Sequence, residues 1–396
     1  MNNIYALMIS LLRAELCRSD PPFPGLSDTD WQEAAVLEPL IRLSAAHDLT
    51  HIIGAALYRM DIPRDNPYAQ VLKKAQINAA IRYEQLQYEL MQITGLFEEA
   101  HIRHIPLKGA VLRSYYPKPE MRTSCDIDLL IEPEALETAS SVLTERLEYS
   151  RQKEGSHDVS FLSPCGVHLE LHFTLLEDKS DPRIQQVLSR VWTYAKQQPE
   201  RSYAFQLQPE FFYFYHIAHM VKHFLYGGCD IRPFMDLWVM RHRWTAVDRD
   251  VLDALLEEGG IRTFAGQMQN LSEVWFSGIN PTPDSLGLIR SMEEYLLYGG
   301  LYGSTENRVK VGRMENKGKL SYICSRLFLP YDQMKYDYPI LQKHRALLPF
   351  CEVHRWSRLL SGNTVRRITG ELKINEAVTE DDRLGLQEMF QTLGLQ

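Results

Sequence analysis

Residues 107–131 read LKGAVLRSYYPKPEMRTSCDIDLLI, and the run DIDLLI at the end of this segment is its most informative part. Alternate residues of a β-strand share one face. Asp126 and Asp128 therefore point to the same side, while Ile127 and Leu129 point into a core. Two carboxylates crowded on one face repel each other unless a cation lies between them. The run predicts a buried strand with a rigid pair of acidic side chains.

A second strand candidate, VHLELHF at residues 167–173, supplies a third carboxylate. Its odd-numbered residues are apolar, and its other face carries His168, Glu170 and His172. If this strand lies beside the first, Glu170 joins the two aspartates. Three oxygen-rich side chains on one sheet face can hold two Mg²⁺ ions that align a phosphoryl displacement. A lone DxD is more often a solvated strand face, but the glycine-containing turn upstream and the third carboxylate downstream leave the two interpretations about evenly balanced.

The surrounding residues predict a small α/β unit with a mixed sheet. We expect strands at 102–107, 126–131, 159–163 and 167–173, and helices at 110–116 and 133–148. Asn66-Pro67 opens a long helical pattern that runs to about Ala100. Helical patterns return from Pro209 onward.

The chain is therefore expected to be α+β, with a small mixed β-sheet core flanked by mainly helical N- and C-terminal regions. The expected division is 1–100, helical; 101–200, α/β core; 201–300, helical; and 301–396, a partly helical extension. Within these parts we expect a helix capped by Thr29 and Gln32. Residues 299–318 are expected to be a mobile linker, and the last 25 or so residues to have a weakly amphipathic pattern and partial order.

Composition fits a soluble protein of 396 residues with 45% apolar residues and a net charge of -8. This net negative charge does not indicate a stable nucleic-acid partner. The six cysteines are far apart, with no CxxC pair, which favours reduced thiols in a cytoplasmic protein. No apolar run is long enough for a transmembrane segment, and the N-terminus has the pattern of a docking helix.

Taken together, KGA…R…DIDLLI…LELHF resembles the polymerase-β-like nucleotidyltransferase superfamily, most closely its uncharacterised nucleotidyltransferase family. The resemblance covers about residues 100–245. It implies transfer of a nucleoside monophosphate from an NTP to an acceptor, a small molecule or a protein, with release of pyrophosphate. In that scheme Asp126, Asp128 and Glu170 are the catalytic and metal-binding residues, Mg²⁺ or Mn²⁺ is the cofactor, and Glu170 can act as base.

The resemblance also implies a set of nucleotide-binding residues. Backbone N–H groups at Gly109 and Ala110 would meet the phosphates at a helix N-terminus. Lys108 or Arg122 would neutralise the leaving pyrophosphate, with a salt-bridge role as the alternative for Arg122. His172, two residues from Glu170, is a further candidate for substrate contact.

Two other classes of function stay open. A non-catalytic nucleotide-binding or interaction protein that retains the fold would be favoured by altered residues in the phosphate turn. A zinc hydrolase would use His216, His219 and His223, although HMVKH lacks the glutamate of HExxH. On the following helix, Arg232 and Asp236 are four residues apart and predict a structural ion pair.

Overall fold

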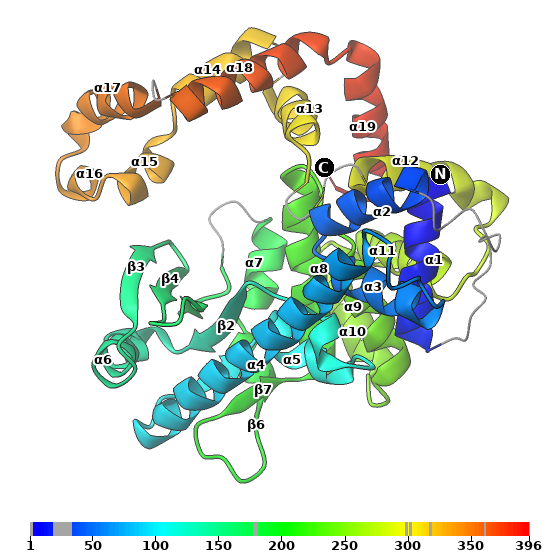
Figure 1. The fold of residues 1–396 in the computed structure, drawn as a ribbon. Helices are drawn as coiled ribbons and strands as arrows, with labels where there is room; N and C mark the ends of the chain where they lie inside the picture. Colours follow the sequence, from blue (N-terminus) through cyan, green and yellow to red (C-terminus); the bar gives the residue numbers. More distant parts are fainter. Residues whose placement is uncertain are drawn as a thin grey trace.

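The computed structural model describes residues 3–18, 34–176, 181–297, 300, 303–316, 319–359 and 362–395. It confirms the α+β class, because a five-stranded mixed sheet is flanked by helices from both ends of the chain (Figure 1). Within the described residues, no helix has both the length and the apolar content needed to span a bilayer.

The five strands form one sheet in the order β1-β2-β5-β4-β3. They are β1 (His104–Pro106), β2 (Asp126–Ile131), β5 (His168–His172), β4 (Asp158–Leu162) and β3 (Ser150–Glu154). The central pair, β2 and β5, is parallel, and the other pairs are antiparallel. A separate two-stranded hairpin is made by β6 (Ala195–Gln197) and β7 (Phe205–Leu207).

The two faces of the sheet have different coverings. Ile127, Leu129 and Ile131 of β2 pack in a core with α4 (Ala69–Glu99) and α6 (Leu136–Arg146). Leu130, on the opposite face, belongs to the larger helical core. Alternation along β2 therefore fixes the strand on both sides at its C-terminal end and leaves Asp126 and Asp128 on the face away from α4 and α6.

The larger core joins helices from distant parts of the sequence. Before the sheet these are α1 (Asn3–Cys17), α2 (Ala34–Ala46) and α3 (Thr50–Arg59). After the sheet they are α7 (Pro182–Leu188), α8 (Pro209–Leu225), α9 (Arg232–Arg243), α10 (Arg249–Glu258), α11 (Arg262–Phe276) and α12 (Pro283–Leu297). The helices before the sheet and the helices after it thus share one apolar core.

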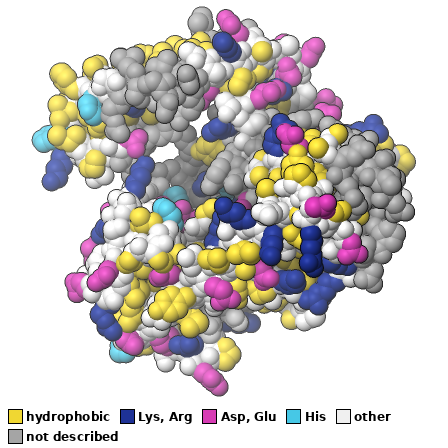
Figure 2. All heavy atoms as spheres, in the orientation of Figure 1, with side chains coloured by type: hydrophobic (Ala, Val, Ile, Leu, Met, Phe, Trp, Pro, Cys, Tyr) yellow, Lys and Arg dark blue, Asp and Glu magenta, His cyan; other side chains and the backbone are white. Residues whose placement is uncertain are grey.

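The C-terminal helices begin and end on this body and extend away from it in between (Figure 1). They are α13 (Thr305–Asn316), α14 (Lys319–Leu327), α15 (Tyr331–Asp337), α16 (Ile340–Lys343), α17 (Leu348–Leu359), α18 (Gly362–Ala377) and α19 (Glu380–Thr392). We call α14 to α17 the arm; it has a small core of its own around Met334 and Leu341. The arm overhangs β3 and β4, and Figure 2 shows a hollow between it and the body. Lys153 of β3 pairs with Asp337 of the arm at 3.3 Å.

One expectation for this part of the chain was wrong. Residues 305–316 of the expected linker form α13, because Val309 and Val311 are buried by neighbouring helices. The C-terminal residues, for which partial order was expected, form α19, which buries Phe390 with its ring 5.9 Å from that of Tyr295. The expected cap at residues 29–32 lies outside the described residues.

Candidate functional site

The pairing of β2 with β5 brings two of the predicted carboxylates together. In the parallel register Asp128 lies opposite Glu170, and Asp126 lies opposite His168. Adjacent strands in a sheet are about 4.8 Å apart, so the third acidic side chain falls beside Asp128. Asp128 is only 5% exposed, whereas the side chain of Glu170 is 39% exposed. The pair therefore has a buried member and a member open to solvent.

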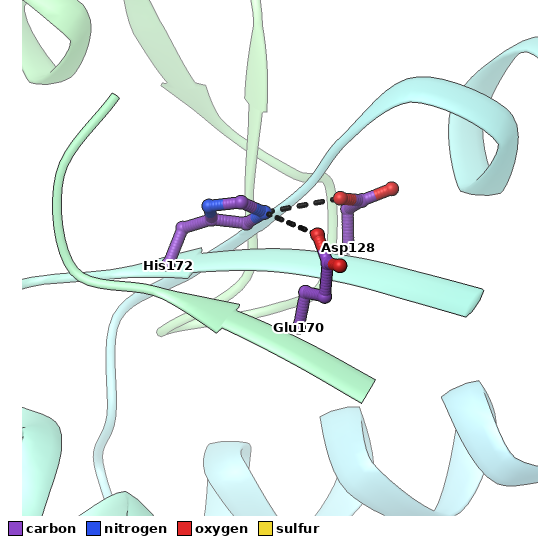
Figure 3. A group of neighbouring side chains, drawn as sticks. All are labelled: Asp128, Glu170 and His172. Carbon is purple, nitrogen blue, oxygen red and sulfur yellow. Dashed lines mark hydrogen bonds and ion pairs between the residues drawn. The ribbon is translucent and has the colours of Figure 1, made fainter. Parts of the chain in front are cut away.

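His172 links these two carboxylates (Figure 3). Its Nε2 lies 3.0 Å from Oδ1 of Asp128 and 3.7 Å from Oε2 of Glu170. Its ring also stacks on that of His157, with centroids 5.8 Å apart. Because an ionised carboxylate only accepts hydrogen bonds, Nε2 carries the proton that His172 donates to Asp128. The imidazole is thus fixed on both sides and holds Asp128 in place.

Lys108 makes the second polar contact to Asp128. Its Nζ donates to Oδ1 of Asp128 at 2.8 Å. Lys108 is the first residue of α5 (Lys108–Leu112), and its backbone is left-handed, with φ of 43°. The preceding N–H, of Leu107, donates to the backbone carbonyl of Asp128 at 3.0 Å. The turn that carries Lys108 is therefore tied to β2 by backbone and side chain together.

The charges in this cluster shift its protonation. Burial would raise the pKa of Asp128, but Lys108 and His172 outweigh it and hold that pKa well below its usual range. Burial, followed by the charge of Asp128, raises the pKa of Glu170 to about 7. The same two causes raise the pKa of Asp126. Burial would lower the pKa of Lys108, yet Asp128 and Tyr215 raise it well above its usual value. Asp128 and Lys108 are thus held as a charged pair.

The turn at Gly109 and Ala110 is stabilised by Arg113, a residue that the sequence analysis did not identify. Arg113 is buried, and its guanidinium donates to the carbonyl of Gly109 at 2.8 Å and to Oγ of Ser124 at 2.9 Å. Ser124 Oγ in turn donates to the carbonyl of Asp126 at 2.9 Å. The N–H of Ala110 is engaged within the turn by the carbonyl of Leu107. Arg113 therefore connects the turn to the start of β2.

Arg122 lies beside the site but is held by a structural partner. Its Nε donates to both carboxylate oxygens of Asp236, at 2.8 and 2.9 Å, and Asp236 is fully buried. The predicted pair between Arg232 and Asp236 is therefore wrong. Arg232 instead donates to Asp230, within its own turn. Arg122 connects the loop before β2 to α9.

The histidines of α8 do not converge as a zinc site. His216 Nε2 lies 3.1 Å from the carbonyl of Pro233, while His219 and His223 are 3.3 Å apart through their Nε2 atoms. Burial, with the charge of Lys108 next, lowers the pKa of His219 well below its usual value. His219 thus lies close to the carboxylate cluster as a neutral side chain.

One group of side chains in the described chain is suited to a metal ion: Asp128, Glu170 and His172, with ligand atoms within 4.8 Å of one another. Carboxylate oxygens suit Mg²⁺ and Mn²⁺, whereas imidazole nitrogen suits softer ions. His172 already donates to Asp128, so it fits the role of orienting a ligand. The two carboxylates, with Asp126 on the same face of β2, fit a hard divalent cation.

Comparison with known proteins identifies the family of this chain. The model of a family described as uncharacterised nucleotidyltransferase matches residues 30–277, which include the whole sheet and the helices that enclose it. No curated protein and no solved structure gives a significant match.

Proposed function

Since the chain belongs to the uncharacterised nucleotidyltransferase family, we propose that it transfers a nucleoside monophosphate from an NTP to an acceptor, in a reaction that depends on Mg²⁺ or Mn²⁺. The observation that carries this proposal is the pairing of Asp128 with Glu170 across two parallel strands. A bound divalent ion would supply charge neutralisation at the α-phosphate and at the attacking oxygen.

Asp126, Asp128 and Glu170 are the residues proposed to hold the metal. Asp128 is buried and fixed by two donors, so it defines where the ion lies. Glu170 is the more exposed partner, and the proposal therefore gives it the proton of the acceptor hydroxyl. His172 orients Asp128 through its Nε2–H rather than contacting the nucleotide.

The triphosphate is proposed to lie over the turn at Lys108 and Gly109. Lys108 brings an ammonium group to this turn, and Arg113 adds a buried guanidinium beneath it. Both charges oppose the negative charge that develops on the leaving pyrophosphate. Arg122 is not assigned to the phosphates here, because Asp236 already occupies its Nε.

The acceptor, a small molecule or a protein, is proposed to enter from the hollow beneath the arm (Figure 2). The arm contacts β3 through Lys153 and Asp337. β3 is an edge strand of the sheet, and β4 separates it from β5. β2 and the Lys108 turn lie on the other side of β5. The NTP and the acceptor would then approach Glu170 from opposite sides.

The alternative is a protein that binds nucleotide without turnover. It is favoured by one specific observation, namely that Lys108 already neutralises Asp128 at 2.8 Å. A screen of the four NTPs with Mg²⁺ or Mn²⁺, in the presence of protein and small-molecule hydroxyl compounds, separates the two. Metal-dependent pyrophosphate release that Asp128→Asn abolishes supports the enzyme. Tight nucleotide binding with no pyrophosphate in any combination supports the alternative.

A control variant is available on the same strand. Glu132 directly follows β2 and pairs with Arg103, well away from the carboxylate cluster. Glu132→Gln removes a carboxylate that is more exposed than that of Asp128, and it leaves the contacts of Asp128 in place. It should leave pyrophosphate release unchanged.

A further inference from the structure

The carboxylate cluster contains a cation of its own, Lys108, and this bears on how many metal ions it can hold. The inference rests on the proposed function. In a two-ion site, the carboxylate between the ions gives one oxygen to each. Asp128 is the residue placed to do this, because it lies between Asp126 on its own strand and Glu170 on the next.

One oxygen of Asp128 is already used. Oδ1 accepts from Nζ of Lys108 at 2.8 Å and lies 3.0 Å from Nε2 of His172. A carboxylate oxygen has two lone pairs, and these two donors take both. Figure 3 shows that the other oxygen of Asp128 points away from His172. Only that oxygen, Oδ2, is left for an ion.

The position of Lys108 is also maintained at a cost. Its φ of 43° is a left-handed conformation that non-glycine residues rarely adopt. Such a backbone is strained and persists where the surroundings enforce it. Here the N–H of the preceding residue bonds to the carbonyl of Asp128, so the strained turn delivers the ammonium directly to the Asp128 carboxylate.

We propose that the Lys108 ammonium takes the place of one of the two divalent cations, so that the site binds a single ion through Asp126, Oδ2 of Asp128 and Glu170. Lys108 then supplies the second positive charge to the polyphosphate. Among the described residues, Asp128, Glu170 and His172 place ligand atoms within 4.8 Å of one another, and Asp126 lies on the same face of β2 as Asp128.

The test counts Mn²⁺ ions on the intact chain by electron paramagnetic resonance. The probes are Mn²⁺ alone and Mn²⁺ with non-hydrolysable α,β-methylene analogues of the four NTPs. The wild type is expected to bind one Mn²⁺ per chain at saturation, without the spectrum of two coupled ions. Lys108→Met keeps a long side chain but removes the charge, and is expected to bind two ions that are spin-coupled.

Lys153→Met is the matched control, because Lys153 is an exposed lysine on β3 that pairs with the arm. It should keep one ion. Two coupled ions in the wild type would overturn the inference while leaving the proposed function intact, and so would a single ion in a folded Lys108→Met. Absence of both Mn²⁺ and nucleotide binding in the wild type would overturn the proposed function as well. Should Lys108→Met fail to fold, the wild-type count still decides the matter.

Discussion

Arg122 and Asp236 form a buried ion pair that joins the loop before β2 to α9, 114 residues later in the chain. The side chain of Arg122 is 12% exposed and that of Asp236 is 0% exposed. Tyr116 also donates to Asp236, at 2.6 Å. Because the loop continues directly into Asp126, this pair holds β2 against the helical body.

Removing one member of this pair should be costly. Asp236→Asn leaves the Arg122 guanidinium buried without its counter-charge, which typically costs about 3–5 kcal/mol. Urea unfolding should show this loss in the free energy of unfolding. As a control, Glu38→Gln breaks the exposed pair with Arg42 on α2 and should cost less than about 0.5 kcal/mol. Equal effects of the two changes would argue against a structural role for Asp236.

His172 should control metal affinity without being a ligand. His172→Gln removes the ring that is fixed between His157 and Asp128, so Asp128 loses part of its orientation. Loss of such an orienting contact typically weakens metal binding about 10- to 100-fold. Titration with Mn²⁺ measures this. His168→Gln, an exposed histidine on the same strand, is the comparison and should change the affinity far less. A normal affinity in His172→Gln would remove His172 from the site.

Acid should destabilise the fold because buried neutral histidines take up protons when the chain unfolds. A substitution of His216 tests this effect at one residue. Burial lowers the pKa of His216 below the value of about 6.5 in the unfolded chain. The unfolded state then binds the extra proton as pH falls below about 6.5, so this contribution to stability is present above that pH and lost beneath it. The raised pKa of Glu170 makes the free energy of unfolding change with pH in the opposite sense. This contribution is the same in the wild type and in the variant.

The measurement is the difference between wild type and His216→Gln. Glutamine does not titrate, so the free energy of unfolding should fall less steeply between pH 7.5 and 5.5 in the variant. Each unit by which the folded pKa lies below the unfolded one is worth up to about 1.4 kcal/mol. Parallel pH profiles for the two proteins would show that His216 is not a buried neutral side chain.

The C-terminal helix should contribute to global stability. Phe390 is 1% exposed and packs edge-to-face with Tyr295 of α12. Phe390→Ala should lower the free energy of unfolding by about 3–5 kcal/mol. Phe328→Ala, at a 58% exposed position on the arm, should be nearly neutral in the same urea experiment. A small loss for Phe390→Ala would indicate that α19 is only loosely attached.

The sequence correctly predicted those elements whose apolar pattern matches their packing in the folded protein. DIDLLI alternates cleanly between the α4 and α6 core and the site, so the bounds of β2 were predicted to the residue. The pairing of Glu170 with Asp128 was also anticipated. By contrast, β3 was missed because all five of its residues, SRQKE, are exposed and polar. An edge strand of this kind carries no apolar alternation.

Other features were missed because they depend on long-range packing. The contact of Arg122 with Asp236 spans 114 residues, and helical spacing favoured Arg232 instead. Arg113 gives no signal in the sequence, since a lone arginine in a short helix is ordinarily solvated. The helix α13 was taken for a linker because its glycine and basic residues outweighed Val309 and Val311, which pack only in the folded chain.

We expect Asp128 to hold the metal through which the nucleotide is bound. Calorimetric titration with Mg²⁺ and a non-hydrolysable NTP analogue tests it most directly, with Glu132→Gln beside Asp128→Asn. We expect nucleotide binding that requires Mg²⁺ in the wild type and in Glu132→Gln, and affinity at least tenfold weaker in a folded Asp128→Asn. Unchanged affinity of Asp128→Asn for the Mg²⁺–nucleotide complex would contradict it.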